Sequence, residues 1–405
     1  MTEIPKWLIS DQIITNSFRN LSIERGNRFQ GIIFFFIVSL SMPIAFLLTN
    51  FRLAIYKIKF VNDRRRFNHK DFLIGNDYET DYFYSKKILK NKGRKFEQFN
   101  QFDPCNFVCS DVGFFNYQKV LIEACKDLLQ ITKFSGWNEK FLILFSSLRN
   151  MLFYVIYREF FKYHKKRGVK DIHLVSMPLN LMCAIEKEGL NCNVYLHGLS
   201  VKILPYQVPS LTNLFLFSRD EKDYFSKFIP IEKIHIYDSN IITDHKNVAI
   251  MLLRQTLKFD EESDDKMGIN DIEAVKEFTD KNNLKLYFKI HPKTEENKIK
   301  ALKKILKIQE NQLLLNRTPV VENILALKPK IIFGWFSSGL AESLHYQVLP
   351  VAIEEKSKFK KINELSNFDY KKRCLSFYNQ RSVLKDAIQD KNKFRETINL
   401  LKNNE

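Results

Sequence analysis

Short apolar runs and longer amphipathic stretches alternate along the chain from about residue 70 onward. The apolar runs predict buried strands over residues 72–75, 172–176, 193–196, 214–217, 233–237, 248–253, 284–290, 330–335 and 348–353. The amphipathic stretches predict helices over residues 82–92, 141–163, 268–282, 294–312, 319–327 and 339–346, with a charged helical tail from about residue 380. Strands and helices that alternate in this way indicate a parallel α/β architecture.

The length of 405 residues exceeds that of one typical domain and suits two of moderate size. The α/β pattern divides near residue 246 into two units of similar size. We therefore predict three regions, 1–70, 71–245 and 246–405, of which the last two are doubly wound, Rossmann-like α/β domains that face a cleft. Because such sheets bind ligands outside the carboxyl ends of their strands, residues just past strand ends are the candidate site residues.

Residues 31–51 form an apolar segment without a charged residue, and their length matches the roughly 20 residues that cross a bilayer. Pro43 and several polar residues lie inside this segment, so it either spans the membrane or lies at the interface; a buried core helix is the alternative. The heavier basic flank follows the segment and includes Arg64, Arg65 and Arg66. Such a flank stays in the cytoplasm beside anionic lipid, which predicts a membrane-associated helix with the following domains on the cytoplasmic face.

Lys and Arg number 64 against 46 Asp and Glu, and the resulting net charge of +18 favours anionic partners. Nucleic acid, anionic lipid headgroups, and acidic or phosphorylated sugars all fit this charge. The sequence contains no zinc-finger spacing, no basic region followed by heptads and no aromatic RNA-binding signature, so nucleic acid is not an expected partner. The 6 cysteines are scattered without zinc-ligand spacing, which indicates free thiols in a reducing compartment.

His291 and Pro292 directly follow the predicted strand 284–290. The proline stops the strand and disfavours a helical conformation for the residue before it, so the imidazole is expected at the carboxyl edge of the sheet. A histidine in that position can donate to a phosphate oxygen and stabilise the charge of a leaving group. The alternative is an ordinary histidine in a loop.

Ser337 and Ser338 follow the strand 330–335 and open the predicted helix 339–346. The start of a helix offers main-chain N–H groups and a positive dipole end, so two hydroxyls beside it form a candidate phosphate site. Simple N-capping by serine is the alternative. Glu342 lies one turn further along and can reach the sugar hydroxyls of a nucleotide, unless it is a solvated residue of the helix surface.

His197 follows the strand 193–196, and the glycine after it permits a sharp turn close to a ligand. The spacing to Lys202 gives the pattern H-G-x-x-x-K. A neutral histidine that projects from the first domain is a candidate general base, and a structural histidine at the turn is the alternative. Asp77 follows the strand 72–75 and is a second candidate for the base on the same domain.

A strand ending in His-Pro, followed by a strand ending in Ser-Ser, resembles bacterial glycosyltransferases of the two-domain GT-B type that use cytidine-activated donors. That group includes sialyltransferases and polysialyltransferases, capsule Kdo transferases and teichoic-acid glycerophosphotransferases. The resemblance covers roughly residues 170–355 and implies that His291, Ser337 and Ser338 hold the donor phosphate. It also implies that residues 71–245 form the acceptor side and residues 246–405 bind the nucleotide sugar.

One departure from this group lies at the end of the strand 193–196. Bacterial sialyltransferases usually carry an acidic pair before glycine at such a position, whereas this chain has Tyr195, Leu196, His197 and Gly198. His-Gly followed by Lys202 is more similar to the polyol-phosphate transferases and to some Kdo-type capsule enzymes.

The resemblance thus predicts an inverting transferase of bacterial surface polysaccharide synthesis (capsule, O-antigen or lipooligosaccharide) at the cytoplasmic face of the inner membrane. It would move sialic acid or a related ulosonic acid from a CMP-sugar to a hydroxyl of a glycan or lipid-linked glycan. We expect no metal and no cofactor, because protein donors stabilise the leaving group and no Asp-x-Asp motif stands at a strand end. A CDP-polyol-type glycerophosphotransferase is the first alternative, and a non-enzymatic, basic, membrane-peripheral binding protein is the second.

Overall fold

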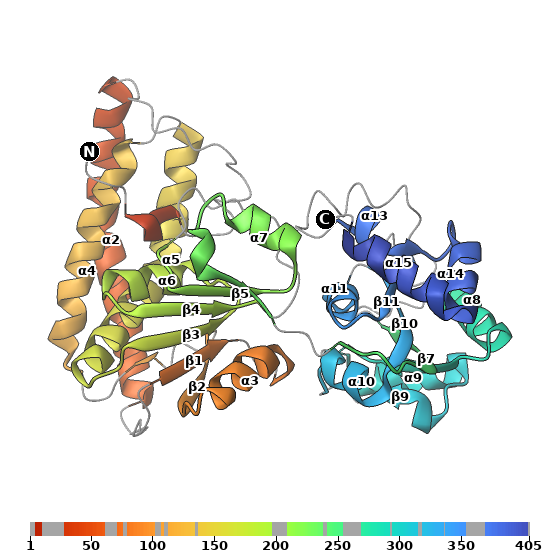
Figure 1. Cartoon of the computed structure of the whole chain (residues 1–405). Helices are drawn as coiled ribbons and strands as arrows, with labels where there is room; N and C mark the ends of the chain where they lie inside the picture. The colour runs from red at the N-terminus through yellow and green to blue at the C-terminus, as the bar shows by residue number, and fades with distance from the viewer. Residues whose placement is uncertain are drawn as a thin grey trace.

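The computed structural model describes residues 5–9, 28–60, 71–75, 79–101, 107–108, 112–133, 137–196, 209–237, 241–253, 269–291, 294–314, 318–335, 337–353 and 369–403. These residues form two six-stranded sheets, each with its own helices, which lie side by side (Figure 1). Every strand pair in both sheets is parallel. The structure therefore confirms the predicted fold class of two Rossmann-like domains in a GT-B-like arrangement.

The first sheet has the strand order β2-β1-β3-β4-β5-β6. Its strands are β1 (Asp71–Gly75), β2 (Phe96–Asn100), β3 (Asp171–Val175), β4 (Asn191–Tyr195), β5 (Asn213–Leu216) and β6 (Ile234–Ile236). The helices of this part are α2 (Arg28–Phe60), α3 (Phe83–Asn91), α4 (Phe114–Leu128), α5 (Trp137–Lys166), α6 (Leu179–Lys187) and α7 (Arg219–Phe225). Short 3-10 helices cover Lys6–Ile9, Glu79–Tyr82, Leu129–Lys133 and Ile231–Lys233.

The second sheet has the strand order β12-β11-β10-β7-β8-β9. Its strands are β7 (Lys246–Leu252), β8 (Lys285–Lys289), β9 (Leu313–Leu314), β10 (Pro329–Gly334), β11 (Leu349–Ala352) and β12 (Leu375–Ser376). Its helices are α8 (Ile269–Lys281), α9 (Glu296–Leu306), α10 (Val320–Leu327), α11 (Ser338–His345), α13 (Tyr370–Arg373), α14 (Arg381–Gln389) and α15 (Lys391–Asn403), with a 3-10 helix at Glu310–Gln312.

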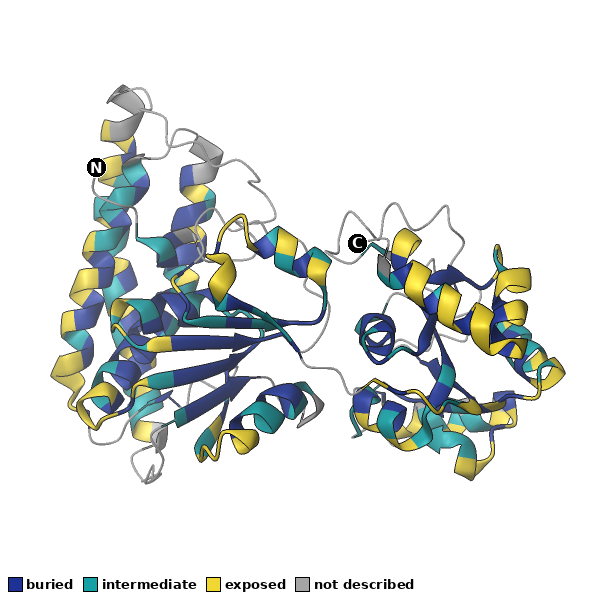
Figure 2. Ribbon diagram, in the orientation of Figure 1, coloured by how far each residue is buried: buried dark blue, intermediate teal, exposed yellow. Residues whose placement is uncertain are grey.

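Most residues of the inner strands are buried, on both faces of each sheet, as the apolar runs predict (Figure 2). In β1, Phe72 faces α5, where its ring lies 5.4 Å from that of Phe160. The next residue, Leu73, points to the opposite face and packs in a cluster with Leu89 of α3. Successive side chains of a strand alternate between faces, so helices on both sides are needed to bury such a run.

Several elements of the structure differ from the predictions. The strand β2 was not predicted, because FEQFN lies at the sheet edge and only Phe99 in it is buried. The helices α4, α6 and α7 were not predicted either. The predicted helix 294–312 ends at Leu306, where Lys307 adopts a left-handed conformation with φ 49° and the chain turns toward β9. That turn sets the boundary, because a left-handed residue interrupts the helical hydrogen-bond ladder.

The apolar segment near the N-terminus belongs to α2, which extends beyond residues 31–51 at both ends. One stripe of α2, including Phe34, Val38 and Leu53, is buried against the first domain. Many other large apolar side chains between Ile32 and Ile58 are exposed, with Leu40 at 73% and Ile58 at 76%. Among the described residues, two helices are long and apolar enough to cross a membrane. The first, Ile32–Ile58, has a mean hydropathy of 2.5, and 22% of its most apolar segment is buried in the protein. The second, Lys140–Lys166, has a mean hydropathy of 1.3, and 61% of its most apolar segment is buried.

Candidate functional site

The carboxyl edge of the second sheet brings the predicted donor-site residues to one side of the molecule. Gly334 of β10, Leu252 of β7 and Lys289 of β8 lie in one row across three neighbouring strands. His291 lies two residues after Lys289, past the end of β8, and Ser337 lies three residues after Gly334, past the end of β10. Because β7 separates the two strands, their backbones are about 10 Å apart, twice the usual strand spacing.

Ser337 is the N-cap of α11. Its side chain accepts a hydrogen bond from the main-chain N–H of Gly339 at 3.2 Å, and its carbonyl accepts from Leu340 at 3.1 Å. A Cβ at Gly339 would lie only 2.6 Å from Cδ1 of Leu252. Glycine at this position therefore lets α11 begin directly against β7, and Ser337 and Ser338 remain half-buried at the edge of the sheet.

His291 is half-buried, and its carbonyl accepts a hydrogen bond from the main-chain N–H of Thr294 at 3.0 Å. Two residues earlier, the side chain of Lys289 is 4% exposed. Burial lowers the pKa of Lys289 to about 8, because an ammonium loses hydration inside the protein. The sequence analysis did not single out Lys289; the signal was a charged residue inside the apolar run 286–290, directly before the His-Pro pair.

Glu342 lies in the second turn of α11 and is 7% exposed, which excludes the alternative of a solvated helix residue. Burial, and then the charge of Asp81, raise the pKa of Glu342 to about 8. The carboxyl group therefore carries its proton at neutral pH. Its predicted contact with sugar hydroxyls stays a prediction, and the observed surroundings belong to the junction between the two domains.

The far end of α11 contacts the first domain. The hydroxyl of Tyr346 lies 3.4 Å from that of Tyr84 in α3, and the Tyr84 ring stacks on Tyr237 at 4.5 Å. The Tyr346 carbonyl also accepts from the main-chain N–H of Ile242, which precedes β7. The helix that begins at the candidate phosphate site thus ends in an aromatic contact between the domains.

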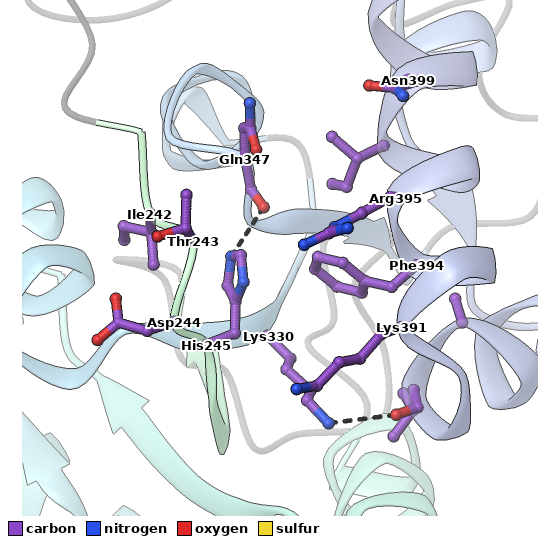
Figure 3. A pocket seen from close by; sticks show the side chains of 13 residues that line it. Ile242, Thr243, Asp244, His245, Lys330, Gln347, Lys391, Phe394, Arg395 and Asn399 are labelled. Carbon is purple, nitrogen blue, oxygen red and sulfur yellow. Dashed lines mark hydrogen bonds between the residues drawn. The ribbon is translucent and has the colours of Figure 1, made fainter.

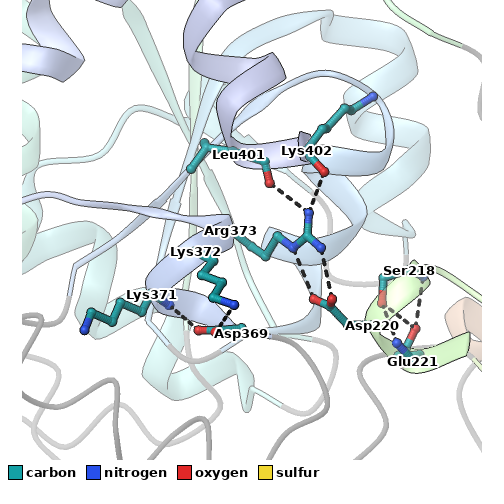
Figure 4. Close-up of polar contacts among 9 residues, drawn as sticks. All are labelled: Ser218, Asp220, Glu221, Asp369, Lys371, Lys372, Arg373, Leu401 and Lys402. Carbon is teal, nitrogen blue, oxygen red and sulfur yellow. Dashed lines mark hydrogen bonds and ion pairs between the residues drawn. The ribbon is translucent and has the colours of Figure 1, made fainter. Parts of the chain in front are cut away.

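A buried ion pair makes a second connection between the domains (Figure 4). Nε and Nη2 of Arg373 in α13 donate to the two carboxylate oxygens of Asp220 in α7, at 3.1 and 3.0 Å. Nη1 donates to the carbonyls of Leu401 and Lys402 at the end of α15, at 3.0 and 2.7 Å. Arg373 is 2% exposed and the side chain of Asp220 is 28% exposed, so these contacts join α7, α13 and α15 at the margin of the buried region.

The carboxyl edge of the first sheet points toward the second domain (Figure 1). Ser176, directly after β3, has φ 75°, a strained left-handed conformation for a residue with a side chain. Its N–H donates to the carbonyl of Tyr195 in β4 at 2.9 Å. The predicted acceptor-side residues and one donor-side residue lie outside the described residues; they are Asp77, His197, Lys202 and Pro292.

Comparison with known proteins gives one family match. The model of the alpha-2,8-polysialyltransferase family matches residues 153–389, more than half of the chain, and this range holds His197, His291, Ser337 and Ser338. No curated protein sequence matches the chain.

Several solved structures are similar to this one. The wall teichoic acid polymerase TagF has 13% sequence identity and a TM-score of 0.43, with 91% of each chain covered. The S. aureus MnaA–UDP complex has 12% identity and a TM-score of 0.43, with 82% of this chain and 91% of that chain covered. A UDP-GlcNAc 2-epimerase from Methanocaldococcus jannaschii, in complex with UDP-GlcNAc and UDP, has 14% identity and a TM-score of 0.37, with 72% and 86% covered.

Proposed function

The chain belongs to the alpha-2,8-polysialyltransferase family, and on this premise we propose that it transfers sialic acid from a CMP-linked donor to a glycan hydroxyl with inversion. Family membership makes the chain an enzyme and implies a CMP-sialic acid donor and a glycan acceptor, so the alternative of a non-enzymatic binding protein no longer applies. We place the reaction in the synthesis of a bacterial surface polysaccharide, such as capsule, O-antigen or lipooligosaccharide. A related ulosonic acid linked to CMP is the alternative donor.

The observation that carries the proposal is the position of His291, Ser337 and Ser338 at the carboxyl edge of one parallel sheet. We assign residues 246–405 to donor binding and residues 71–245 to the acceptor. His291 and the two serines, together with Pro292, would form the site for the CMP phosphate, and the buried ammonium of Lys289 would add positive charge to it. Such preorganised donors stabilise a leaving phosphate without the help of a metal.

In the proposed step, the acceptor oxygen bonds to the anomeric carbon on the face opposite to CMP. The bond from that carbon to the phosphate oxygen breaks, and CMP leaves with the electron pair. His197 takes the proton of the acceptor hydroxyl and Lys202 assists on the acceptor side, with Asp77 as the alternative base. Glu342 is a positioning residue in this scheme, because it is buried in α11 where this helix meets the first domain.

The first test compares His291→Ala with His235→Ala, since both histidines are half-buried and His235 lies on the edge strand β6. We measure CMP release from CMP-sialic acid in the presence of a sialylated acceptor, and thermal stabilisation by CMP. His291→Ala should lose about 100-fold or more in transfer and most of its stabilisation by CMP, whereas His235→Ala keeps both. A folded His291→Ala variant with full transfer would refute the assignment.

The H-G-x-x-x-K spacing favours one competing function, the transfer of a polyol phosphate from a CDP-linked donor. Both donors release CMP, so the products decide between the reactions. Sialic acid transfer gives a glycosidic bond without phosphorus, and polyol transfer leaves one phosphate in the product. Incorporation of phosphorus from CDP-glycerol, together with no transfer from CMP-sialic acid, would replace the proposed function by this alternative.

We also propose that α2 attaches the enzyme to the cytoplasmic face of the inner membrane. The buried stripe of α2 spreads along its length, and Nζ of Lys57 near its end donates to the carbonyl of Val112 at 2.8 Å. A helix bound to the domain in this way fits a position within the membrane interface, with its exposed apolar surface toward lipid. Flotation with vesicles that contain phosphatidylglycerol should recover the wild type, and Leu40→Asp combined with Leu47→Asp should reduce recovery. Unchanged flotation of that variant would contradict the proposal.

A further inference from the structure

A cavity of about 290 Å³ lies in the second domain, at the amino edge of its sheet (Figure 3). Its walls come from residues 242–245, which precede β7, from Lys330 near the start of β10, from Gln347 just before β11, and from α14 and α15. The candidate donor site occupies the opposite, carboxyl edge of the same strands. The two sites are therefore separated by the length of the sheet.

Three cations line this cavity. Lys391 and Arg395 lie one turn apart on α15 and extend toward its centre, while Lys330 enters from β10 (Figure 3). Nζ of Lys330 donates to the carbonyl of Ile388 at 3.2 Å. Burial, and then the charge of Lys391, lower the pKa of Lys330. Lys330 and Lys391 thus stand close enough to repel each other, and an anion between them would relieve this repulsion. Lys391 and Arg395 are exposed, so an anion can reach them from solvent.

The carboxylates around the cavity do not neutralise this charge. Within the part of the chain that the structure describes, Asp244 is the single carboxylate that lines it, and it already forms an ion pair with Lys328. Neither Lys391 nor Arg395 forms an ion pair with a residue that the structure describes. By contrast, Lys393 on the outer side of the same helix pairs with Asp386 at 3.3 Å.

The other residues that line the cavity offer an aromatic ring and hydrogen-bonding groups, which suit a hydroxylated molecule. The ring of Phe394 lies 4.9 Å from that of His245, and Nε2 of His245 is 3.0 Å from the carbonyl oxygen of Gln347. The side chains of Thr243 and Asn399 add hydrogen-bonding groups. An aromatic ring with polar groups around it can hold both the apolar face and the hydroxyls of a sugar.

From this geometry we propose that the cavity binds a sugar-sized anion, a monosaccharide unit with a carboxylate or phosphate, with Arg395 and Lys391 on its charged group. The volume of about 290 Å³ is at the lower end for ligand sites and suits one sugar ring. The guanidinium of Arg395 can bind a carboxylate or phosphate through two parallel hydrogen bonds. This inference does not rest on the proposed function, because it concerns a separate site and is measured as binding.

The experiment uses the full chain in detergent, saturated with CMP so that the donor site does not contribute. We titrate N-acetylneuraminic acid, glucose 6-phosphate, inorganic phosphate and the neutral N-acetylglucosamine at constant ionic strength, and measure heat. At least one of the two anionic sugars should bind. Arg395→Glu should weaken that binding tenfold or more, whereas Lys393→Glu on the outer side of α15 should leave it unchanged.

Three results would overturn the proposal: no binding of either anionic sugar to the wild type, equal binding by Arg395→Glu, or binding of N-acetylglucosamine as tight as that of the acids. Inorganic phosphate that binds as well as glucose 6-phosphate would overturn the sugar part, since the cavity would then recognise charge alone. A result in which the carboxylate sugar binds and the phosphate sugar does not would identify the acid group, and the reverse would identify the phosphate. The outcome is independent of transfer activity, so failure of the proposed function does not affect it.

Discussion

Replacing Glu342 by glutamine removes one titratable group from the helix that links the candidate donor site to the first domain. In the folded protein, burial and the charge of Asp81 raise the pKa of Glu342 to about 8, from an ordinary value of 4.5. Between these two pH values the unfolded chain has lost the proton while the folded chain keeps it. The stability of the wild type should therefore fall as pH rises through this window and level off above about pH 8.

The size of the effect follows from the two pKa values. A difference of one pKa unit corresponds to about 1.4 kcal/mol, so the change from 4.5 to about 8 amounts to about 4–5 kcal/mol at full ionisation. Glutamine has nearly the same shape as the protonated acid and does not ionise. Glu342→Gln should thus be about as stable as the wild type at pH 5 and more stable by several kcal/mol at pH 9.

The assay is urea unfolding of both proteins at pH 5, 7 and 9 in the same detergent. Glu322→Gln is the matched control, because Glu322 is exposed on the neighbouring helix α10 and should show no such divergence. If the difference in unfolding free energy between Glu342→Gln and the wild type is the same at all three pH values, the reasoning from burial is refuted. A difference of opposite sign would show that the ionised carboxylate stabilises the junction.

Three further results are expected. Arg373→Met should lower the free energy of unfolding by about 3 kcal/mol, near the lower end for a broken buried ion pair, because the Asp220 side chain is 28% exposed. A double-mutant cycle with Asp220→Ala should show a coupling energy of at least about 1 kcal/mol, and strict additivity would contradict the contact. Gly339→Ala should cost about 1–3 kcal/mol, measured by denaturant unfolding, because its Cβ would meet Leu252 at 2.6 Å; unchanged stability would argue against the close approach of α11 to β7. Lys289→Met should stay folded and weaken CMP binding about tenfold by calorimetry, since it removes about 1.4 kcal/mol of charge interaction; equal affinity would exclude Lys289 from the donor site.

Much of the fold was readable from the chain because burial on both faces of a parallel strand leaves an uninterrupted apolar run. The runs that became β7, β10 and β11 are of this kind, and the proline after His291 marks where β8 ends. The edge strand β2 was not predicted, because a strand with one buried side chain has no continuous apolar run. His291 and the serines were found because strand ends are local features.

The sequence by itself thus determined the two α/β units, the apolar N-terminal helix, and the residues that stand just past the strands of the second sheet. Only the tertiary structure decided the strand order, which places β7 between the strands of His291 and Ser337. It also decided that Glu342 and Lys289 are buried, and that residues near 242, 330 and 395 share one cavity. The periodicity of apolar residues along the chain shows which face of a helix or strand is buried. It does not show which element packs against that face, because that depends on contacts between residues far apart in the sequence.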